Sequence, residues 1–187
     1  NESMLAIRAH GCTRNLPEDS TINEKKEDPF YESFNFIVPG FNLRPLEMEG
    51  AIGLRQLKKT DKMIGFRRSN ARYFMEQMKK YEDIRVQKEV GESSWFGFSM
   101  VLTGKLSNKR SMLVKKLQEA NIDCRPIVAG NFTRNPVIKY MDYDIPASLD
   151  NADEIHDQGL FIGNYSSNNC AQVDYLISVL DDFLTEN

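Results

Sequence analysis

PGFNLRPLEMEGAIGLRQLKK, residues 39–59, is the stretch from which the rest of the chain is best interpreted. A glycine turn at Gly40 delivers Asn42 and Arg44 to a point just before Pro45, a residue that suits the first position of a helix. An amide, a guanidinium and free backbone N–H groups at a helix start favour an anion, because the helix dipole is positive there. We therefore expect a phosphate-binding turn, with a capping role for the two side chains as the alternative.

Two glycines follow within the predicted helix. Gly50 and Gly53 lie three residues apart and give the helix a face of small residues. Such a face usually packs closely against another element. We expect this helix to be buried.

Composition and charge narrow the classes of partner. The chain has 187 residues with 24 Lys and Arg against 27 Asp and Glu, a formal charge of −3, which argues against nucleic acid or an anionic membrane. No apolar run is long enough to span a bilayer and no secretion signal is visible, so we expect a cytoplasmic protein. Cys12, Cys124 and Cys170 lie far apart, which is typical of reduced thiols, and we expect no bound metal.

Periodicity and turn residues predict a mixture of helices and strands. The predicted helices are the end of one at 1–11, the one after Pro45, 60–81, 107–121, 149–158 and a last one after Asn168 or Asn169. The predicted strands are 84–89, 94–102, 122–128 and 160–162, with a polar loop at 13–29 and a strand or extended arm at 30–38. In strand 94–102 we expect Phe96, Phe98, Met100 and Leu102 on one side. This order predicts a small sheet covered on one face by helices.

The first residues look like the middle of an element. There is no initiator Met, so we expect a piece of a longer protein.

Several polar residues outside the opening stretch are candidates for a site. His10 follows a helix end and Arg14 lies in the polar loop; a surface histidine and a solvated charge are the alternatives. Arg125 and Arg134 flank a glycine turn, and two nearby exposed arginines often indicate anion recognition. His156 is expected to face solvent with a structural role or none.

No complete catalytic motif is present. The chain has no GxSxG, P-loop, GxGxxG or HExxH pattern and no cysteine pair at metal-ligand spacing. From the residues alone, it is an anion-binding piece of an α/β enzyme.

Five segments together resemble the DegT/DnrJ/EryC/StrS sugar aminotransferase family of vitamin B6 enzymes. They are RAHGCTRNLP (8–17), residues 39–59, GESSWFGFSMVL (91–102), CRPIVAGNFTRNPV (124–137) and NADEIHDQGLFIGN (151–164). The resemblance covers essentially the whole chain. The GFNLRP turn is shared across the family, whereas ESSWFGFS and RPIVAGNF resemble a narrower branch of dehydratases.

The resemblance implies an α+β fold, the small C-terminal domain of a fold-type I PLP-dependent transferase. This domain has a short antiparallel sheet covered by helices and a long linking helix. Residues 1–38 would be a helix end and a loop or arm left from the large cofactor domain, and residues 39–187 the small domain. The upstream part would carry the aspartate facing the pyridine nitrogen, a stacking aromatic, and a histidine in place of the usual Schiff-base lysine.

The resemblance also implies an activity. The enzyme would use pyridoxal or pyridoxamine 5'-phosphate to remove the C3 hydroxyl of a GDP-sugar, with L-glutamate regenerating the amine form of the cofactor. It would be a homodimer with shared active sites that makes a deoxysugar, such as colitose, for lipopolysaccharide O-antigen. The alternatives are a nucleotide-sugar 4-aminotransferase of the perosamine type and a non-catalytic dimerisation or binding module. This chain alone is expected to be inactive.

Individual roles follow from the same resemblance. Asn42 would reach the partner subunit's cofactor phosphate, and Arg14 and Arg44 the diphosphate of the nucleotide sugar. His10 would contribute to the facing site, and Phe34 would form part of the substrate wall.

A second group of substrate-binding residues is implied further along the chain, namely Asp123, Arg125, Asn131 and Arg134. Two departures from the family stand out: Cys12 occupies a position where tryptophan is expected, and Asp123 one where glutamate is expected. Residues 15–41 contain no cysteine, which argues against the related dehydratase that carries an iron–sulfur cluster.

Overall fold

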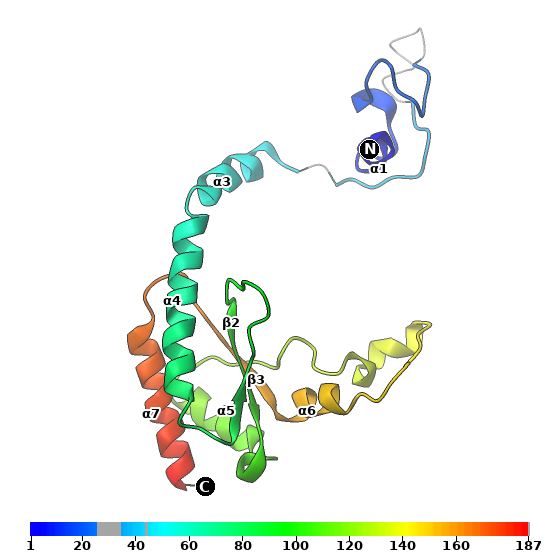
Figure 1. The fold of residues 1–187 in the computed structure, drawn as a ribbon. Coiled ribbons are helices and arrows are strands. Elements are labelled where there is room, and N and C mark those ends of the chain that lie inside the picture. The colour runs from blue at the N-terminus through cyan, green and yellow to red at the C-terminus, as the bar shows by residue number, and fades with distance from the viewer. Residues whose placement is uncertain (26–34, 44, 187) are drawn as a thin grey trace. The chain divides into compact units, whose positions relative to one another are not determined.

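The computed structural model describes residues 1–25, 35–43 and 45–186. Its internal contacts divide the chain into an N-terminal unit, Asn1–Lys58, and a C-terminal unit, Lys59–Asn187. Figure 1 shows the elements of both, and each unit is described by itself. The assignment of residues 1–38 and 39–187 to two domains of a longer enzyme stays a prediction.

A three-stranded antiparallel sheet forms the centre of the C-terminal unit. Its strands are β1 (Ile84–Val86), β2 (Gly97–Leu102) and β3 (Gly159–Gly163), in the order β1-β2-β3. Ile84 pairs with Leu102 at one side of β2, and Gly97 pairs with Gly163 at the other. The predicted short antiparallel sheet is confirmed.

Four helices surround this sheet: α4 (Thr60–Met78), α5 (Arg110–Glu119), α6 (Asp150–Gln158) and α7 (Cys170–Glu186). Helices α4 and α7 lie side by side, and α5 packs against α7 and β3 (Figure 1). Short 3-10 turns connect them at η2 (Gly104–Leu106), η3 (Phe132–Arg134) and η4 (Pro136–Tyr140). With the sheet, these helices confirm the α+β class.

The core lies between the sheet and helices α4, α5 and α7. The Phe74 ring of α4 stacks on the Phe98 ring of β2 with centroids 4.2 Å apart. Leu113 of α5 and Leu180 of α7 are fully buried in the same cluster. The regular spacing of apolar residues therefore corresponds to one shared interior.

A buried amide pair ties the C-terminal unit together. The Asn70 amide donates to Asn164 Oδ1 (3.0 Å) and to the carbonyl of Ser167 (2.7 Å). The Asn164 amide donates to the carbonyls of Arg67 (3.0 Å) and Trp95 (2.9 Å). These bonds fix α4, the segment before β2 and the segment after β3 relative to one another, because buried polar groups are costly when left unpaired.

The N-terminal unit contains α1 (Glu2–Ile7), the 3-10 turn η1 (Thr13–Asn15) and α3 (Glu47–Leu57). Backbone pairing joins Ala9 to Asn42 and Cys12 to Phe36. The Glu2 carboxylate accepts hydrogen bonds from the Thr21 amide (2.8 Å) and the Ser20 hydroxyl (2.9 Å). This unit is thus held mainly by backbone and polar contacts.

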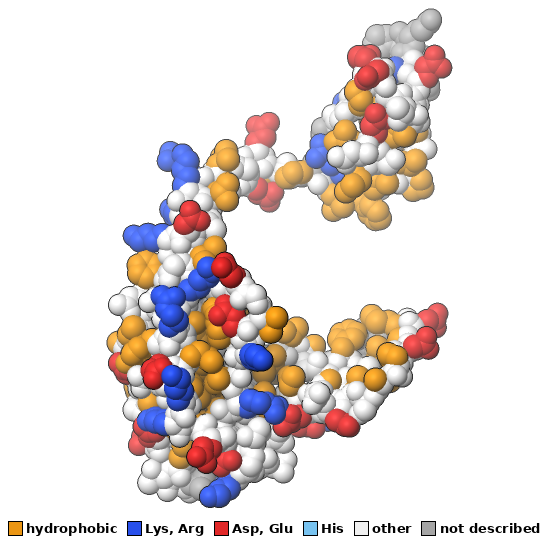
Figure 2. Space-filling model, in the orientation of Figure 1, with side chains coloured by type: hydrophobic (Ala, Val, Ile, Leu, Met, Phe, Trp, Pro, Cys, Tyr) orange, Lys and Arg blue, Asp and Glu red, His pale blue; other side chains and the backbone are white. Residues whose placement is uncertain are grey.

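Helix α3 differs from its prediction in two ways. It begins at Glu47, two residues after Pro45, with the Glu49 carboxylate accepting from the Leu46 amide (3.1 Å). It buries none of its residues, and among the described residues no atom lies within 4 Å of a Cβ placed at Gly50 or Gly53. The expected close packing is therefore wrong for this structure, and Figure 2 shows apolar side chains on the surface of α3.

Two strand predictions also need correction. Segment 122–128 is a loop that touches β3 through a single backbone pairing of Arg125 with Phe161. Phe96 does not share the side of Phe98 because Trp95, just before it, has a left-handed backbone (φ 53°) that breaks the alternation. Phe98 is consequently buried while Phe96 is 62% exposed.

In the described part of the chain, no helix combines the length and the apolar character needed to cross a bilayer.

Candidate functional site

Two glycines bring distant parts of the N-terminal unit together. Gly11 has φ 82°, and a Cβ there would lie 1.7 Å from the Val38 carbonyl oxygen. A Cβ on Gly40 would lie 2.2 Å from the Gly11 nitrogen. Only residues without a side chain allow this approach, so the RAHG and PGFN motifs meet because of their glycines.

Backbone hydrogen bonds hold the two motifs in register. The His10 amide donates to the Phe41 carbonyl (3.0 Å), and the Phe41 amide donates to the Ile7 carbonyl (2.7 Å). The Leu43 amide donates to the Arg8 carbonyl (3.0 Å). The positions of His10 and Asn42 are therefore set by main-chain contacts.

A cavity of about 280 Å³ opens at this junction. Three residues predicted from the sequence, His10, Arg14 and Asn42, line it together with Ala9, Cys12, Asn15 and Phe36. The structure thus brings together His10 and Asn42, which lie 32 positions apart in the chain. Cys12, which stands where tryptophan was expected, is buried beside them.

The donors around this cavity suit an anion. Among the described residues, the Asn42 amide and the His10 imidazole have no side-chain hydrogen bond, so both remain available to a ligand. Arg14 adds a permanent positive charge. A phosphate ester is the kind of group that a guanidinium and neutral N–H donors bind well.

Two predicted site residues cannot be placed in this cavity. Phe34 and Arg44 lie outside the described residues.

Asp123 and Arg125 lie in the C-terminal unit, on the loop that touches β3. The Arg125 amide donates to the Phe161 carbonyl (3.0 Å), and the Phe161 amide donates back to the Arg125 carbonyl (2.7 Å). Both side chains are exposed, and Arg125 lines a cavity of about 350 Å³ beside α5. Burial, with a smaller effect of Asp123, raises the pKa of the intervening Cys124 thiol, which keeps it protonated.

Asn131 and Arg134 are engaged within the C-terminal unit. The side chain of Asn131 is buried. Its Nδ2 donates to Asp153 Oδ1 (2.9 Å), and its Oδ1 accepts from the backbone N–H of Thr133 (3.0 Å). Arg134 contacts both oxygens of Asp157 at 2.9 Å, and its hydrogen bond holds the pKa of that carboxyl below its usual range. These contacts shape the loop after Gly130, and a role in substrate binding stays a prediction.

His156 is not simply solvent-facing, as the sequence suggested. Its Nδ1 accepts a hydrogen bond from the Asn131 amide at 3.2 Å, and its side chain packs against Gly130. Its role in the structure is to hold the loop.

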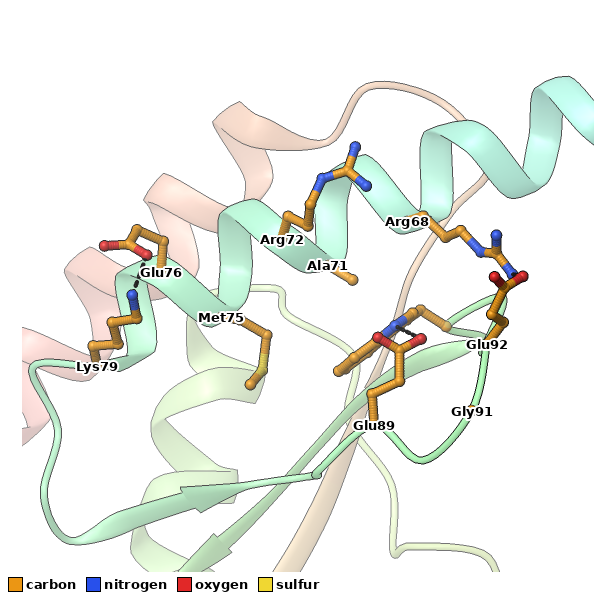
Figure 3. Close-up of a pocket in the computed structure, with 10 residues that line it drawn as sticks. Arg68, Ala71, Arg72, Met75, Glu76, Lys79, Glu89, Gly91 and Glu92 are labelled. Atoms are coloured by element: carbon orange, nitrogen blue, oxygen red, sulfur yellow. Dashed lines mark hydrogen bonds and ion pairs between the residues drawn. The ribbon is translucent and has the colours of Figure 1, made fainter.

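A larger cavity of about 570 Å³ lies between α4 and segment 89–95 (Figure 3). Several of its polar groups are paired: Arg68 forms an ion pair with Glu92 (3.4 Å), and Glu89 accepts a hydrogen bond from the Trp95 indole N–H (3.1 Å). None of the predicted site residues that the structure describes lines it. It therefore adds nothing to the predicted site.

The sequence missed two side chains next to Arg125. They are Phe96 and Arg67. The guanidinium carbons of Arg67 and Arg125 each lie 5.6 Å from the centroid of the Phe96 ring. Phe96 was expected on the same side of its strand as Phe98, and Arg67 was not singled out. The WFG sequence, an aromatic before a glycine at a strand start, was the available signal.

Two curated relatives match the chain closely. GDP-4-keto-6-deoxy-D-mannose 3-dehydratase of Escherichia coli O55:H7 is 49% identical over 179 residues, covering 95% of this chain and 46% of the relative. The enzyme of the same name from Yersinia pseudotuberculosis is 50% identical over an equal length, with the same coverage. The chain therefore spans about half the length of the curated relatives it matches.

A solved structure of GDP-4-keto-6-deoxymannose-3-dehydratase with a trapped PLP–glutamate geminal diamine has the same fold. It is 48% identical and superimposes with a TM-score of 0.90, covering 96% of this chain and 47% of that one. The family model of the DegT/DnrJ/EryC1/StrS aminotransferases matches residues 1–181. The chain belongs to the DegT/DnrJ/EryC1/StrS aminotransferase family.

Proposed function

We propose that this chain is the C-terminal part of a PLP- and PMP-dependent 3-dehydratase that acts on GDP-4-keto-6-deoxy-D-mannose. The observation that carries this proposal is the cavity in which His10, Arg14 and Asn42 meet. The identity of about half of all aligned positions to two dehydratases of this name supports the substrate class.

The residues of the cavity fit a cofactor phosphate. The Asn42 amide, unpaired among the described residues, donates to a phosphate oxygen, and Arg14 stabilises anionic oxygens of the bound ligands. His10 holds a further N–H or lone pair at the same opening. When bound, the amine form of the cofactor would supply the nitrogen that joins the C4 carbonyl and, after losing a proton, the electron pair that replaces the C3–O bond as hydroxide leaves.

We propose that several of the predicted residues bind the substrate. Arg125 and Asp123 contact the nucleotide sugar from the loop beside β3, and Arg44 acts with Arg14 on its diphosphate. Phe34 forms part of the wall around the sugar. Asn131 and Arg134 complete the adjoining loop, which their contacts to Asp153 and Asp157 keep in place.

The same proposal includes the assembly and the pathway. The protein is a cytoplasmic homodimer in which Asn42, Arg14 and His10 serve the facing subunit's site. L-Glutamate regenerates the amine form of the cofactor. The product is a 3,6-dideoxy sugar nucleotide for colitose and O-antigen synthesis.

The activity is tested by incubating the complete enzyme with PMP, L-glutamate and GDP-4-keto-6-deoxy-D-mannose. The expected product is a sugar nucleotide with one oxygen atom fewer, seen by mass spectrometry together with 2-oxoglutarate. A product that keeps the C3 hydroxyl and gains an amine at C4 would instead identify an aminotransferase. Absence of any turnover with bound cofactor would support a non-catalytic module.

The role of Asn42 is tested by its affinity for the cofactor. Asn42→Ala should weaken PMP binding about tenfold, the loss expected for one hydrogen bond to a charged group. Asn23→Ala removes an exposed amide of the same unit that donates to the Glu24 carbonyl, and should leave the affinity unchanged. Equal affinities of both variants would remove Asn42 from the cofactor site.

A further inference from the structure

Phe96 is an exposed aromatic ring on a rigid support. The Asn164 amide N–H donates to the Phe96 carbonyl (3.1 Å), and the Asn164 side chain donates to the Trp95 carbonyl (2.9 Å). The left-handed backbone of Trp95 turns Phe96 outward while the indole stays buried. The backbone conformation of Trp95 therefore exposes the Phe96 ring to solvent. Residues in such sparsely populated conformations are common at ligand sites.

A second ring extends this support. The Phe161 ring lies over Gly97, where an added Cβ would be 2.2 Å from Phe161 Cζ. Phe96 and Phe161 stack with centroids 5.8 Å apart and an interplanar angle of 27°. The glycine of the WFGF motif thus makes room for a continuous aromatic surface.

Two guanidinium groups lie on this surface. Arg67 Cζ and Arg125 Cζ are each 5.6 Å from the Phe96 centroid, and Arg125 Cζ is 5.0 Å from the Phe161 centroid. These distances are within the range of cation–π attraction. The rings therefore fix the positions of two positive charges contributed by α4 and by the loop beside β3.

These two charges lack a counter-ion in the described part of the chain. Neither guanidinium forms an ion pair or a side-chain hydrogen bond with another described residue, and Arg67 Nε is buried without a partner. Two cations held beside one ring repel each other, and an unpaired buried N–H is costly. An anion with several oxygens between them would relieve both effects.

We propose that Arg67, Phe96 and Arg125 form one binding surface for the diphosphate of the nucleotide sugar. This inference rests on the proposed function and adds two residues to it: Arg67 binds the phosphates directly, and Phe96 positions both guanidinium groups. A diphosphate fits better than a single carboxylate because it offers oxygens on two adjacent phosphorus atoms to two separate forks.

The test measures GDP binding to the complete enzyme by titration calorimetry. Arg67→Gln should weaken GDP binding about tenfold, as expected for the loss of a charge-assisted hydrogen bond. Phe96→Leu should weaken GDP binding about threefold, whereas Phe96→Tyr, which keeps an aromatic ring, should bind GDP like the wild type. Arg72→Gln, on the same helix, removes an exposed charge outside this surface and should bind GDP like the wild type.

Steady-state kinetics separate positioning from a general loss of structure. For Phe96→Leu, KM for the nucleotide sugar should rise while kcat and KM for L-glutamate stay unchanged. A change in KM for glutamate alone would assign the surface to the amino donor and overturn the diphosphate proposal. Wild-type affinity for GDP in Arg67→Gln, or an equal loss in Arg72→Gln, would also overturn it.

The proposed function can fail separately from this inference. If Arg67→Gln binds GDP about tenfold more weakly than the wild type, while the wild-type product retains the C3 hydroxyl, the surface stands and the dehydratase assignment falls. If the wild-type enzyme itself does not bind GDP, both fall.

Discussion

The two units of the chain bury very different amounts of apolar surface. In the C-terminal unit, Phe74, Leu113 and Leu180 are completely enclosed by a core shared between sheet and helices. In the N-terminal unit, small residues such as Ala6 are buried, whereas Phe41 is 65% exposed. The C-terminal unit is therefore stabilised by its own hydrophobic core, whereas the N-terminal unit depends largely on turns and hydrogen bonds.

The difference matters for function because the proposed cofactor residues lie in the N-terminal unit, which has little apolar core. His10 and Asn42 are positioned by backbone pairing and by the close approach of Gly11 and Gly40. The C-terminal unit, with its large core, positions Arg67, Phe96 and Arg125. The geometry of the first group should respond to its surroundings more readily than that of the second.

The largest expected effect contrasts two phenylalanines. Phe74→Ala removes a fully buried ring stacked on Phe98 and should lower the free energy of unfolding by about 3–5 kcal/mol. Phe41→Ala truncates an exposed ring in the other unit and should change it by less than about 0.5 kcal/mol. Urea unfolding of the 187-residue chain, followed by circular dichroism, measures both.

Phe74→Leu provides a milder step if the alanine variant does not fold. It should cost about 1 kcal/mol, still more than Phe41→Ala. Similar losses at the two positions would mean that Phe41 is covered in solution, and the contrast between the units would disappear.

The sequence predicted the C-terminal unit well because its apolar spacing reflects a core present in the same chain. The stripe that includes Val173, Ile177 and Leu180 is buried as α7, and residues 150–158 form a helix as expected. Helix α3 shows the limit of this reasoning. Periodicity identifies an apolar face, but it does not say which surface covers that face.

The site was only partly predictable for a related reason. The residues alone indicated an anion site at Asn42, but His10 and Arg14 joined it through resemblance to a family. Their meeting depends on the close approach of two glycine turns, which no local pattern encodes. Phe96 was missed because the left-handed backbone of Trp95 reverses the alternation expected of a strand.

A second contrast compares two glycines and should produce effects of opposite sign. Gly97→Ala puts a methyl group into the Phe161 ring and should lower stability by about 1–3 kcal/mol. Gly53→Ala meets no atom within 4 Å among the described residues and should stabilise α3 by about 0.5–1 kcal/mol. Urea midpoints and far-ultraviolet helix content distinguish the two, and a loss of stability in Gly53→Ala would show that α3 is closely packed after all.

The smallest contrast concerns two surface carboxylates, Asp181 and Glu2, at acid pH. Hydrogen bonds from Lys80 (2.7 Å) and Tyr81 (2.7 Å) hold the pKa of Asp181 below its usual range, and the Thr21 amide, with Ser20, does the same for Glu2. A lowered folded-state pKa contributes stability above the unfolded pKa, near 4, and this contribution is lost as pH falls through the folded value. Asp181→Asn should therefore be less stable than the wild type at pH 6, with the difference shrinking toward pH 2, whereas its neighbour variant Asp182→Asn should match the wild type throughout.

Glu2→Gln should behave differently because it lies outside the main core. Its urea midpoint should stay unchanged at every pH, and the loss should appear only as faster hydrogen exchange at the Thr21 amide. If Glu2→Gln moved the acid midpoint as far as Asp181→Asn, the two units would unfold as one cooperative structure. The stability of the turn that holds Glu2 would then depend on the C-terminal core. The same would apply to the cavity lined by His10, Arg14 and Asn42.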